Sequence, residues 1–170
     1  MSQTPLHSPT AIRPPQARVL RYALVQSTWH RDIVDRGRDS FLAEMARRGV
    51  APAQIDLFEV PGALEIPLHT QKLARTGRYA AVVTCGLVVD GGIYRHEFVA
   101  DAVIRALMDI QLDAEIPVIS AVLTPQRFHA HEDHLQFFGR HFVVKGIEAA
   151  TACLDTVQSL QRVEDLALAT

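Results

Sequence analysis

The feature that most constrains the fold is a long apolar run in the middle of the chain, Tyr79–Val89. Its sequence, YAAVVTCGLVV, is apolar at odd and even positions alike, as is typical of a central strand in a parallel sheet that is covered on both faces. Apolar runs at Val19–Gln26 and Ile116–Leu123 have the same character, whereas Ile55–Val60 alternates apolar and polar residues like a half-buried strand. The pattern therefore predicts a sheet that needs helices over both of its faces.

Apolar residues at helical spacing fill the intervals between these runs. Helices are expected at His30–Arg48, Leu64–Arg75, His96–Leu112 and Val144–Leu160. Strands that alternate with helices predict right-handed crossovers and a parallel sheet. We therefore expect an α/β fold, a three-layer α/β/α sandwich around a four-stranded, flavodoxin-like parallel sheet.

The composition suits one globular domain with a sizeable core, because 48% of the 170 residues are hydrophobic and 21% are charged. The Pro-rich segment 1–17 is expected to be a flexible arm, or an edge strand completed by a partner. The single domain is then expected to span residues 18–162, and residues 163–170 to form a C-terminal tail.

Charge and hydropathy exclude several classes of protein. The net charge is −2 and like charges form no run, so neither a nucleic acid nor a membrane surface is expected as a partner. No stretch approaches the ~20 apolar residues of a membrane span, and the N-terminus does not resemble a secretory signal. Cys85 and Cys153 lie in separate apolar segments, which favours buried thiols over a disulfide and predicts a cytoplasmic protein.

The site is expected at the carboxyl ends of the strands, where open α/β sheets bind their ligands. That rule selects the segments Ser27–Arg31, Pro61–Glu65, Asp90–Glu97 and Thr124–His134. The unusual residues of the chain collect in these segments, so a function located there is favoured over a purely structural explanation.

The first two segments contain an aromatic and a carboxylate, each with two interpretations. Trp29, the only tryptophan, either caps the core or offers a flat face on which a heterocycle stacks. Glu65, in the first turn of a helix, either caps that helix or accepts hydrogen bonds from ligand hydroxyls. In the second case the backbone N–H groups of Ala63 and Leu64 would face the ligand.

The third segment, Asp90–Glu97, is the most informative. Its adjacent glycines, Gly91 and Gly92, allow backbone N–H groups to approach an anion closely at the start of a helix. Arg95 and His96 follow at once: an arginine pairs with phosphate, and a histidine moves protons near neutral pH. The segment therefore predicts an anion site with a group capable of acid–base chemistry.

The fourth segment contains a histidine cluster that resembles the HxHxDH signature of metallo-β-lactamase-like hydrolases. The candidate zinc ligands would be His129, His131, Asp133 and His134. The chain is short for that two-sheet fold, and Thr124 is not followed by the expected histidine. We therefore expect no metal site, and a cluster that contacts phosphate or solvent at a subunit boundary instead.

Together, in order and at suitable spacing, the motifs of residues 19–155 resemble those of the lumazine synthases. They resemble above all the divergent second type that some bacteria carry beside the usual one. The matching pieces are Trp29, PGALEIP (61–67), GLVVDGGIYRHEFV (86–99), IPVISAVLT (116–124) and KGIEAA (145–150).

The resemblance implies a cofactor-independent transferase of riboflavin biosynthesis. It would condense 5-amino-6-(D-ribitylamino)uracil with 3,4-dihydroxy-2-butanone 4-phosphate to 6,7-dimethyl-8-ribityllumazine, phosphate and water. It also implies homo-oligomers built from pentamers, with active sites at subunit interfaces and a decamer as the expected second-type assembly. The arm would then add to the sheet edge of a neighbour.

Site residues carry over position by position. Trp29 would stack on the pyrimidine, and backbone N–H groups of Gly92 and Ile93 would bind the phosphate. Ser120 would line the pocket from a neighbouring subunit. The uracil and ribityl chain would be held by Ala63, Leu64, Glu65, Leu87, Val88 and Val89. The family's phosphate-binding arginine falls at His134 in an ungapped alignment, with Arg127 as a nearby alternative, because the spacing to Lys145 differs.

One departure concerns the chemistry itself, since the family's usual catalytic histidine falls at Arg95, one place before His96. Arginine stays protonated in proteins and is a poor proton shuttle but a good anchor for an anion. We therefore expect Arg95 to stabilise the leaving phosphate, while His96 or another nearby histidine moves protons. The same departure leaves a flavin or lumazine carrier as an alternative function, and a zinc hydrolase as a weaker one.

Overall fold

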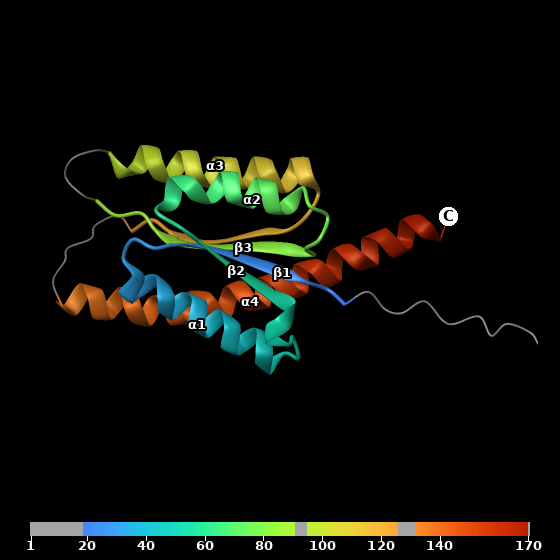
Figure 1. Ribbon diagram of the computed structural model, residues 1–170, viewed down its shortest axis with the longest axis horizontal. Helices are drawn as coiled ribbons and strands as arrows, with labels where there is room; N and C mark the ends of the chain where they lie inside the picture. Colours follow the sequence, from blue (N-terminus) through green and yellow to red (C-terminus); the bar gives the residue numbers. More distant parts are fainter. Residues whose placement is uncertain (1–18, 91–94, 126–131, 170) are drawn as a thin grey trace, which may run out of the picture.

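The computed structural model of the chain describes residues 19–90, 95–125 and 132–169 (Figure 1). Its strands are β1 (Tyr22–Ser27), β2 (Ile55–Val60), β3 (Ala81–Leu87) and β4 (Val118–Leu123). Its α-helices are α1 (Arg31–Arg47), α2 (Ile66–Ala74), α3 (His96–Ala114) and α4 (Glu132–Leu168), and short 3-10 helices lie at Pro52–Gln54 and Ala63–Glu65.

All strand pairs are parallel, and the strand order is β2-β1-β3-β4. In Figure 1, α2 and α3 cover one face of this sheet while α1 and α4 cover the other. The prediction of a three-layer α/β/α sandwich with a four-stranded parallel sheet is therefore confirmed.

Two hydrophobic cores follow from the alternation of side chains along the central strands. Leu24 of β1 and Val83 of β3 pack toward α1 and α4, whereas Val25 and Val82 pack toward α2 and α3. Every residue of β1 and β3 is buried, as the apolar run Tyr79–Val89 predicts. The edge strands β2 and β4 are only partly buried, although Ile116–Leu123 was expected to be a buried strand.

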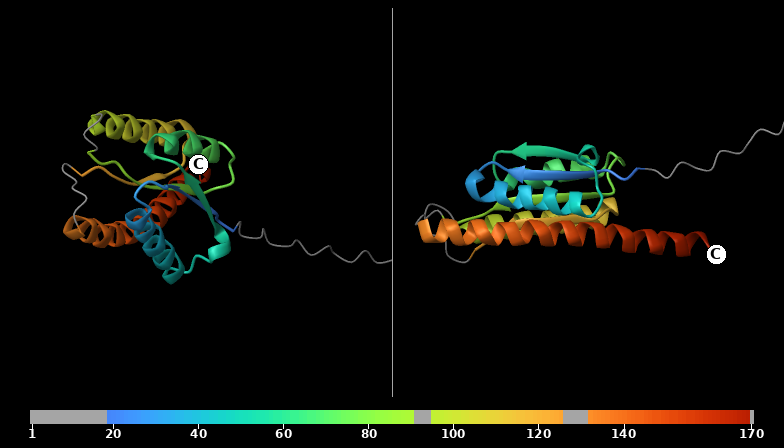
Figure 2. Two further views of the ribbon diagram at one scale, coloured as in Figure 1. Left: turned by 60° about the vertical axis from the view of Figure 1, so that its left-hand side comes forward. Right: turned by 90° about the horizontal axis from the view of Figure 1, so that it is seen from below.

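Helix α4 is longer than the sequence predicted, because it begins at Glu132 rather than Val144 and ends at Leu168 rather than Leu160. Its first turns face the core through Phe138 and Phe142, an apolar spacing that the surrounding histidines obscured. Its last turns run beyond the sheet (Figure 2), so residues 163–168, expected as a tail, continue the helix. The predicted arm, 1–17, lies outside the described residues.

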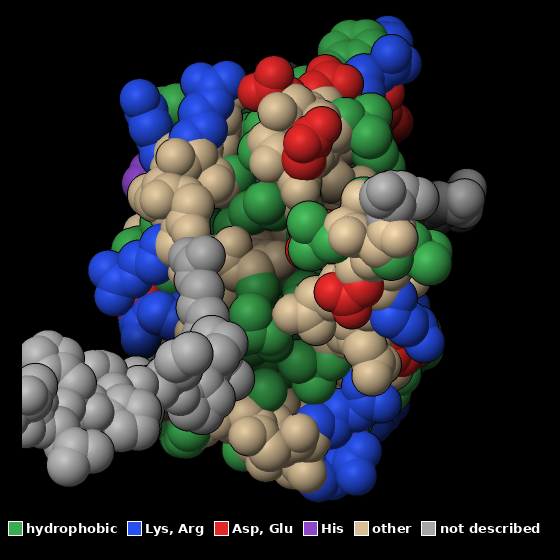
Figure 3. All heavy atoms as spheres, turned by 90° about the vertical axis from the view of Figure 1, so that its right-hand side faces the viewer, with side chains coloured by type: hydrophobic (Ala, Val, Ile, Leu, Met, Phe, Trp, Pro, Cys, Tyr) green, Lys and Arg blue, Asp and Glu red, His purple; other side chains and the backbone are tan. Residues whose placement is uncertain are grey.

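The amino ends of the strands carry a network of charged and phenolic side chains. Asp56 accepts hydrogen bonds from Arg21 (2.6 Å) and from the hydroxyl of Tyr79 (2.7 Å). The hydrogen bond from Arg21 is the main cause that lowers the pKa of Asp56. Figure 3 shows this end of the molecule, where apolar side chains line a central furrow between charged rims.

Both cysteines are free and buried, as predicted. Burial raises the pKa of Cys85 and that of Cys153 to about 12, so both thiols stay protonated at neutral pH. Within the described residues, no helix is long and apolar enough to span a membrane.

Candidate active site

A cavity of about 420 Å³ opens at the carboxyl ends of the strands. The loops after β1 and β2, the end of β3 and the start of α3 all contribute to its wall. Eight residues that the sequence predicted for the site line it: Trp29, Ala63, Leu64, Glu65, Leu87, Val88, Val89 and Arg95. This cavity therefore lies at the end of the sheet that the rule for open α/β sheets selects.

Trp29 is displayed to solvent rather than packed in the core, since its side chain is 60% exposed. Backbone hydrogen bonds from Thr28 to Val60 (2.9 Å) and from Trp29 to Pro61 (3.3 Å) hold its loop against the loop after β2. A Cβ atom at Gly62 would lie 3.2 Å from Cζ3 of Trp29, so the indole ring rests against a residue without a side chain. This exposure disfavours the core-capping interpretation of Trp29.

His30 follows Trp29 and also lines the cavity. It adopts the left-handed conformation, with φ 55° and ψ 43°, at the N-cap of α1. Its carbonyl oxygen accepts hydrogen bonds from the N–H groups of Ile33 and Val34, both at 2.9 Å. The backbone therefore turns sharply at His30 and is fixed there by the first turn of α1.

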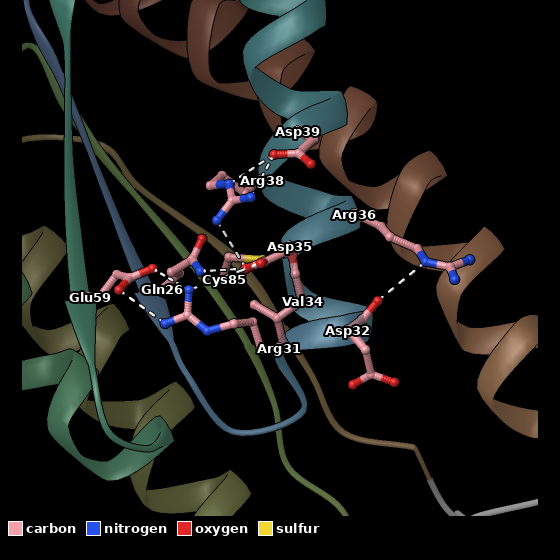
Figure 4. Close-up of polar contacts among 10 residues, drawn as sticks. All are labelled: Gln26, Arg31, Asp32, Val34, Asp35, Arg36, Arg38, Asp39, Glu59 and Cys85. Carbon is pink, nitrogen blue, oxygen red and sulfur yellow. Dashed lines mark hydrogen bonds and ion pairs between the residues drawn. The ribbon is translucent and has the colours of Figure 1, made fainter.

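The start of α1 is tied to the sheet by polar contacts drawn in Figure 4. Arg31 forms a bidentate pair with Glu59 of β2, at 2.8 and 3.0 Å. Gln26 of β1 donates to Asp35 at 2.8 Å, and Asp35 also accepts from Arg38 at 2.9 Å. These contacts fix the helix that follows the Trp29 loop, and so limit where that loop can lie.

Glu65 has the capping role that the sequence predicted as one alternative, and it also lines the cavity. Its Oε2 accepts a hydrogen bond from the backbone N–H of Gly62 at 2.8 Å, a capping contact at the start of the 3-10 helix. The residue is exposed and also lines the cavity. The carboxylate therefore shapes the loop that supports Trp29 and faces the cavity at the same time.

Arg95 is the N-cap residue of α3 and brings a positive charge to the cavity. Its guanidinium carbon lies 5.8 Å from the ring centroid of Phe98, within the range of a cation–π contact. No carboxylate of the described residues forms an ion pair with Arg95. The guanidinium is therefore available to an anionic ligand.

His96, the next residue, faces elsewhere. Its side chain is buried and lines a separate cavity of about 330 Å³ with Glu97, Thr124 and Pro125. Its Nδ1 lies 3.6 Å from Oε2 of Glu97. Within one chain, then, the two candidate catalytic residues point into different cavities.

The remaining predicted residues do not line the Trp29 cavity of the same chain. Ser120 is exposed on β4, His134 lies edge-on to Phe138 at the start of α4, and Lys145 of α4 pairs with Glu148 at 2.6 Å. The residues that lie outside the described part of the chain are Gly92, Ile93, Arg127, His129 and His131, and the side chain of Asp133 is not described either. Among the residues that are described, no group of three His, Cys, Asp or Glu could hold a metal ion.

Four residues of the cavity wall were not predicted: His30, Gly62, Phe98 and Val99. His30 could have been found from its position beside Trp29 in a strand-to-helix loop. Phe98 lies three residues after Arg95, a spacing that brings side chains together on a helix. Gly62 has an extended φ of −134°, so its lack of a side chain matters for contact with Trp29 and not for backbone freedom.

Comparison with known proteins places these features in a family. The family model described as 6,7-dimethyl-8-ribityllumazine synthase matches residues 19–161. A protein of Bradyrhizobium diazoefficiens named 6,7-dimethyl-8-ribityllumazine synthase 2 is 57% identical over 155 residues, which cover 91% of this chain and 93% of the relative. A Pseudomonas syringae pv. tomato protein of the same name is 58% identical over 147 residues, 85% of this chain and 86% of the relative.

A more distant relative helps to place the chain within the family. The protein of Caulobacter vibrioides named 6,7-dimethyl-8-ribityllumazine synthase 1 is 39% identical over 149 residues, 88% of this chain and 95% of the relative. The chain is thus more similar to these relatives named synthase 2 than to this one named synthase 1. On the match over 19–161 and on these identities, the chain belongs to the 6,7-dimethyl-8-ribityllumazine synthase family, in its second-type bacterial form.

Proposed function

We propose that this lumazine synthase homologue condenses 5-amino-6-(D-ribitylamino)uracil with 3,4-dihydroxy-2-butanone 4-phosphate. The products are 6,7-dimethyl-8-ribityllumazine, phosphate and water, as a step of riboflavin biosynthesis. The observation that carries the proposal is a single cavity that joins an exposed indole ring, Trp29, to a cation without a carboxylate partner in the described residues, Arg95. One substrate is a planar heterocycle and the other carries a phosphate, so the cavity offers each a fitting group.

The heterocycle is bound by stacking and by the strand ends. Trp29 supplies a flat apolar face whose largely exposed ring is free to be covered by a pyrimidine. Ala63, Leu64 and Glu65 border the cavity on one side, and the segment 87–89 borders it on the other. Glu65 accepts hydrogen bonds from the hydroxyl groups of the ribityl chain.

The phosphate is bound at the start of α3. Backbone N–H groups of Gly92 and Ile93 donate to it, and Arg95 supplies a fixed positive charge as the C–O bond to the phosphate breaks. Stabilising a leaving anion does not require a group that changes protonation state. Arg95 therefore suits this role, although it cannot shuttle a proton as the family's usual histidine does.

The complete site is shared between subunits of a pentamer-based homo-oligomer, with a decamer as the expected form. Ser120, Arg127, His134 and Lys145 would reach the site from a neighbouring chain, which is consistent with the absence of Ser120, His134 and Lys145 from the Trp29 cavity of their own chain. The exposed apolar side chains of α3, among them Met108 and Leu112, are typical of a surface that another subunit covers. The arm, 1–17, adds to the sheet edge of a neighbour, and the free thiols suit the cytoplasm.

A second candidate function is a lumazine or flavin carrier, favoured by the arginine at the position of the usual histidine. A single-turnover assay separates the two functions by following the fluorescence of the lumazine product after both substrates are mixed with the protein. Catalysis predicts product formation that depends on both substrates and on protein concentration. A carrier would bind added lumazine but would form product no faster than the substrates do alone.

A further inference from the structure

The left-handed backbone of His30 is unusual and well fixed. Residues other than glycine adopt positive φ only rarely, histidine being one of the more tolerant, and such residues concentrate at functional sites. The carbonyl oxygen of His30 accepts hydrogen bonds from two N–H groups of α1, and the preceding loop is hydrogen-bonded to the loop after β2. The chain therefore maintains a rare backbone conformation at a residue that lines the cavity.

His30 is set apart from the other histidines by its location. The others in the described part of the chain are His69, His96, His134 and His141. None of these lines the cavity that contains Trp29 and Arg95, and His96 lines the cavity on the other side of α3's first turn. His30 is therefore the one described histidine that lines the same cavity as Arg95.

Two charged residues line the cavity together with His30. Glu65 and Arg95 are the charged residues that border the cavity with it, and Arg31, its neighbour on α1, is turned to Glu59 of β2. Glu65 caps the loop after β2 through Gly62. Arg95 stays protonated, whereas an imidazole is the kind of side chain that can both accept and return a proton, and among the described residues that line this cavity within one chain only His30 carries an imidazole.

We propose that His30 is the catalytic base and acid of the phosphate-elimination step, an inference that rests on the proposed function. The amino group of the uracil first condenses with the ketone, and water leaves to give a Schiff base at carbon 2. The C3–H bond then breaks, its electron pair forms a C3–C4 double bond, and the C4–O bond breaks with its pair leaving on phosphate beside Arg95. The proton passes to a ring nitrogen of His30.

The same imidazolium completes the step. It returns the proton to carbon 4 while the enol hydroxyl releases its own proton to water, which yields the ketone at carbon 3. The ribitylamino nitrogen attacks that ketone, and loss of water closes the ring. His30 is thus regenerated as a neutral imidazole. In this scheme Arg95 stabilises the leaving phosphate with a permanent positive charge, and His30 transfers the proton.

The test compares His30→Asn with the wild-type protein and with His141→Asn, the same change at an exposed site on α4. Asparagine tolerates the left-handed conformation but does not titrate, so the variant keeps the turn and removes the proton carrier. Single-turnover product formation is followed from about pH 5.5 to pH 9, and binding of the ribitylaminouracil is measured by quenching of Trp29 fluorescence. His30→Gly is assayed with and without added imidazole.

We expect His30→Asn to lower the single-turnover rate by about 100-fold and to flatten its pH profile, as is typical for loss of general acid–base catalysis. Pyrimidine binding should stay within about twofold of wild type, His141→Asn should match wild type, and imidazole should restore part of the rate of His30→Gly. A wild-type rate in His30→Asn, or weaker binding with an unchanged pH profile, would overturn the role of His30. Absence of product from the wild-type protein would instead overturn the proposed function on which this role depends.

Discussion

Two cavities flank the first turn of α3, and they differ in what they can bind. The first joins four segments of the chain and contains an exposed indole, an imidazole and a cation at Trp29, His30 and Arg95. The second is bordered by His96, Glu97 and the end of β4, and its histidine is almost fully buried. The first offers a flat apolar face to a planar ring and a cation to a phosphate, whereas the second offers one imidazole beside a carboxylate.

The difference arises from a single step along the chain. Arg95 has an extended backbone, with φ −77° and ψ 100°, and His96 is the first residue of the helix. Successive residues at a helix start point in different directions, so neighbours in sequence can serve different spaces. If the first cavity alone carries the chemistry, substitutions that line it should act strongly and His96 should matter least.

The largest effect is expected for Arg95→Ala. Removing the cation deprives the leaving phosphate of a charge-assisted contact of about 3 kcal/mol, so kcat/KM should fall roughly 150-fold. Most of the loss should appear in the single-turnover rate. Arg95→Lys serves as the matched control and should recover part of that rate, because it restores the charge without the bidentate geometry. Near-normal turnover in Arg95→Ala would place the phosphate site elsewhere.

A smaller effect is expected for Trp29→Ala. Stacking of a base on an aromatic side chain contributes about 2 kcal/mol, so KM for the ribitylaminouracil should rise roughly 30-fold. KM for the butanone phosphate should change little, because its phosphate binds at the other end of the cavity. Stability should be nearly unchanged, since the side chain is 60% exposed. Equal increases in both KM values would contradict a separate binding site for the pyrimidine at Trp29.

Gly62→Ala probes the support of the indole ring. The new methyl group would crowd Cζ3 of Trp29 at 3.2 Å and Oε2 of Glu65 at 3.1 Å, while the extended backbone accepts alanine without strain. Overpacking of about 1 kcal/mol should raise KM for the pyrimidine roughly fivefold and shift the emission of Trp29. Gly139→Ala on α4 is the control, because the three atoms nearest to its new methyl group belong to the flexible guanidinium of Arg36.

The same proposal gives Gly62→Ala an internal check. In a Trp29→Phe background the crowding is relieved, since phenylalanine lacks the second ring. Gly62→Ala should then change KM less than it does beside Trp29, a non-additivity that a double-mutant cycle measures. Additive effects would mean that Gly62 does not act through the indole ring.

The layers of the fold could be predicted because hydrophobic periodicity determines them. The run Tyr79–Val89 is apolar on both faces, and β3 is buried throughout. The first turns of α4 were missed, because histidines and aromatic residues mask the apolar spacing of Phe138 and Phe142. The partial exposure of β4 was also missed, since an apolar strand at the edge of a sheet has the same sequence pattern as a central one.

The sequence predicted which segments form the candidate site, but not the directions in which their side chains point. Parallel strands place their carboxyl ends at one edge, which brings Trp29 and Glu65 into one cavity from separate loops. Whether His96 shares that cavity depends on the backbone angles of Arg95, which no residue pattern specifies. The left-handed backbone of His30 was likewise not predicted from the sequence.

The smallest effect on turnover is expected for His96→Gln. Glutamine keeps a polar group near Glu97 but cannot carry a proton, so the change tests His96 as a proton carrier and little else. With His96 in the second cavity, the single-turnover rate should fall at most about threefold, and its pH profile should be retained. If the single-turnover rate of His96→Gln fell as much as that of Arg95→Ala, both cavities would have to take part in the same reaction. In an assembly of several chains that result would require a substrate or a neighbouring subunit to bridge the first turn of α3.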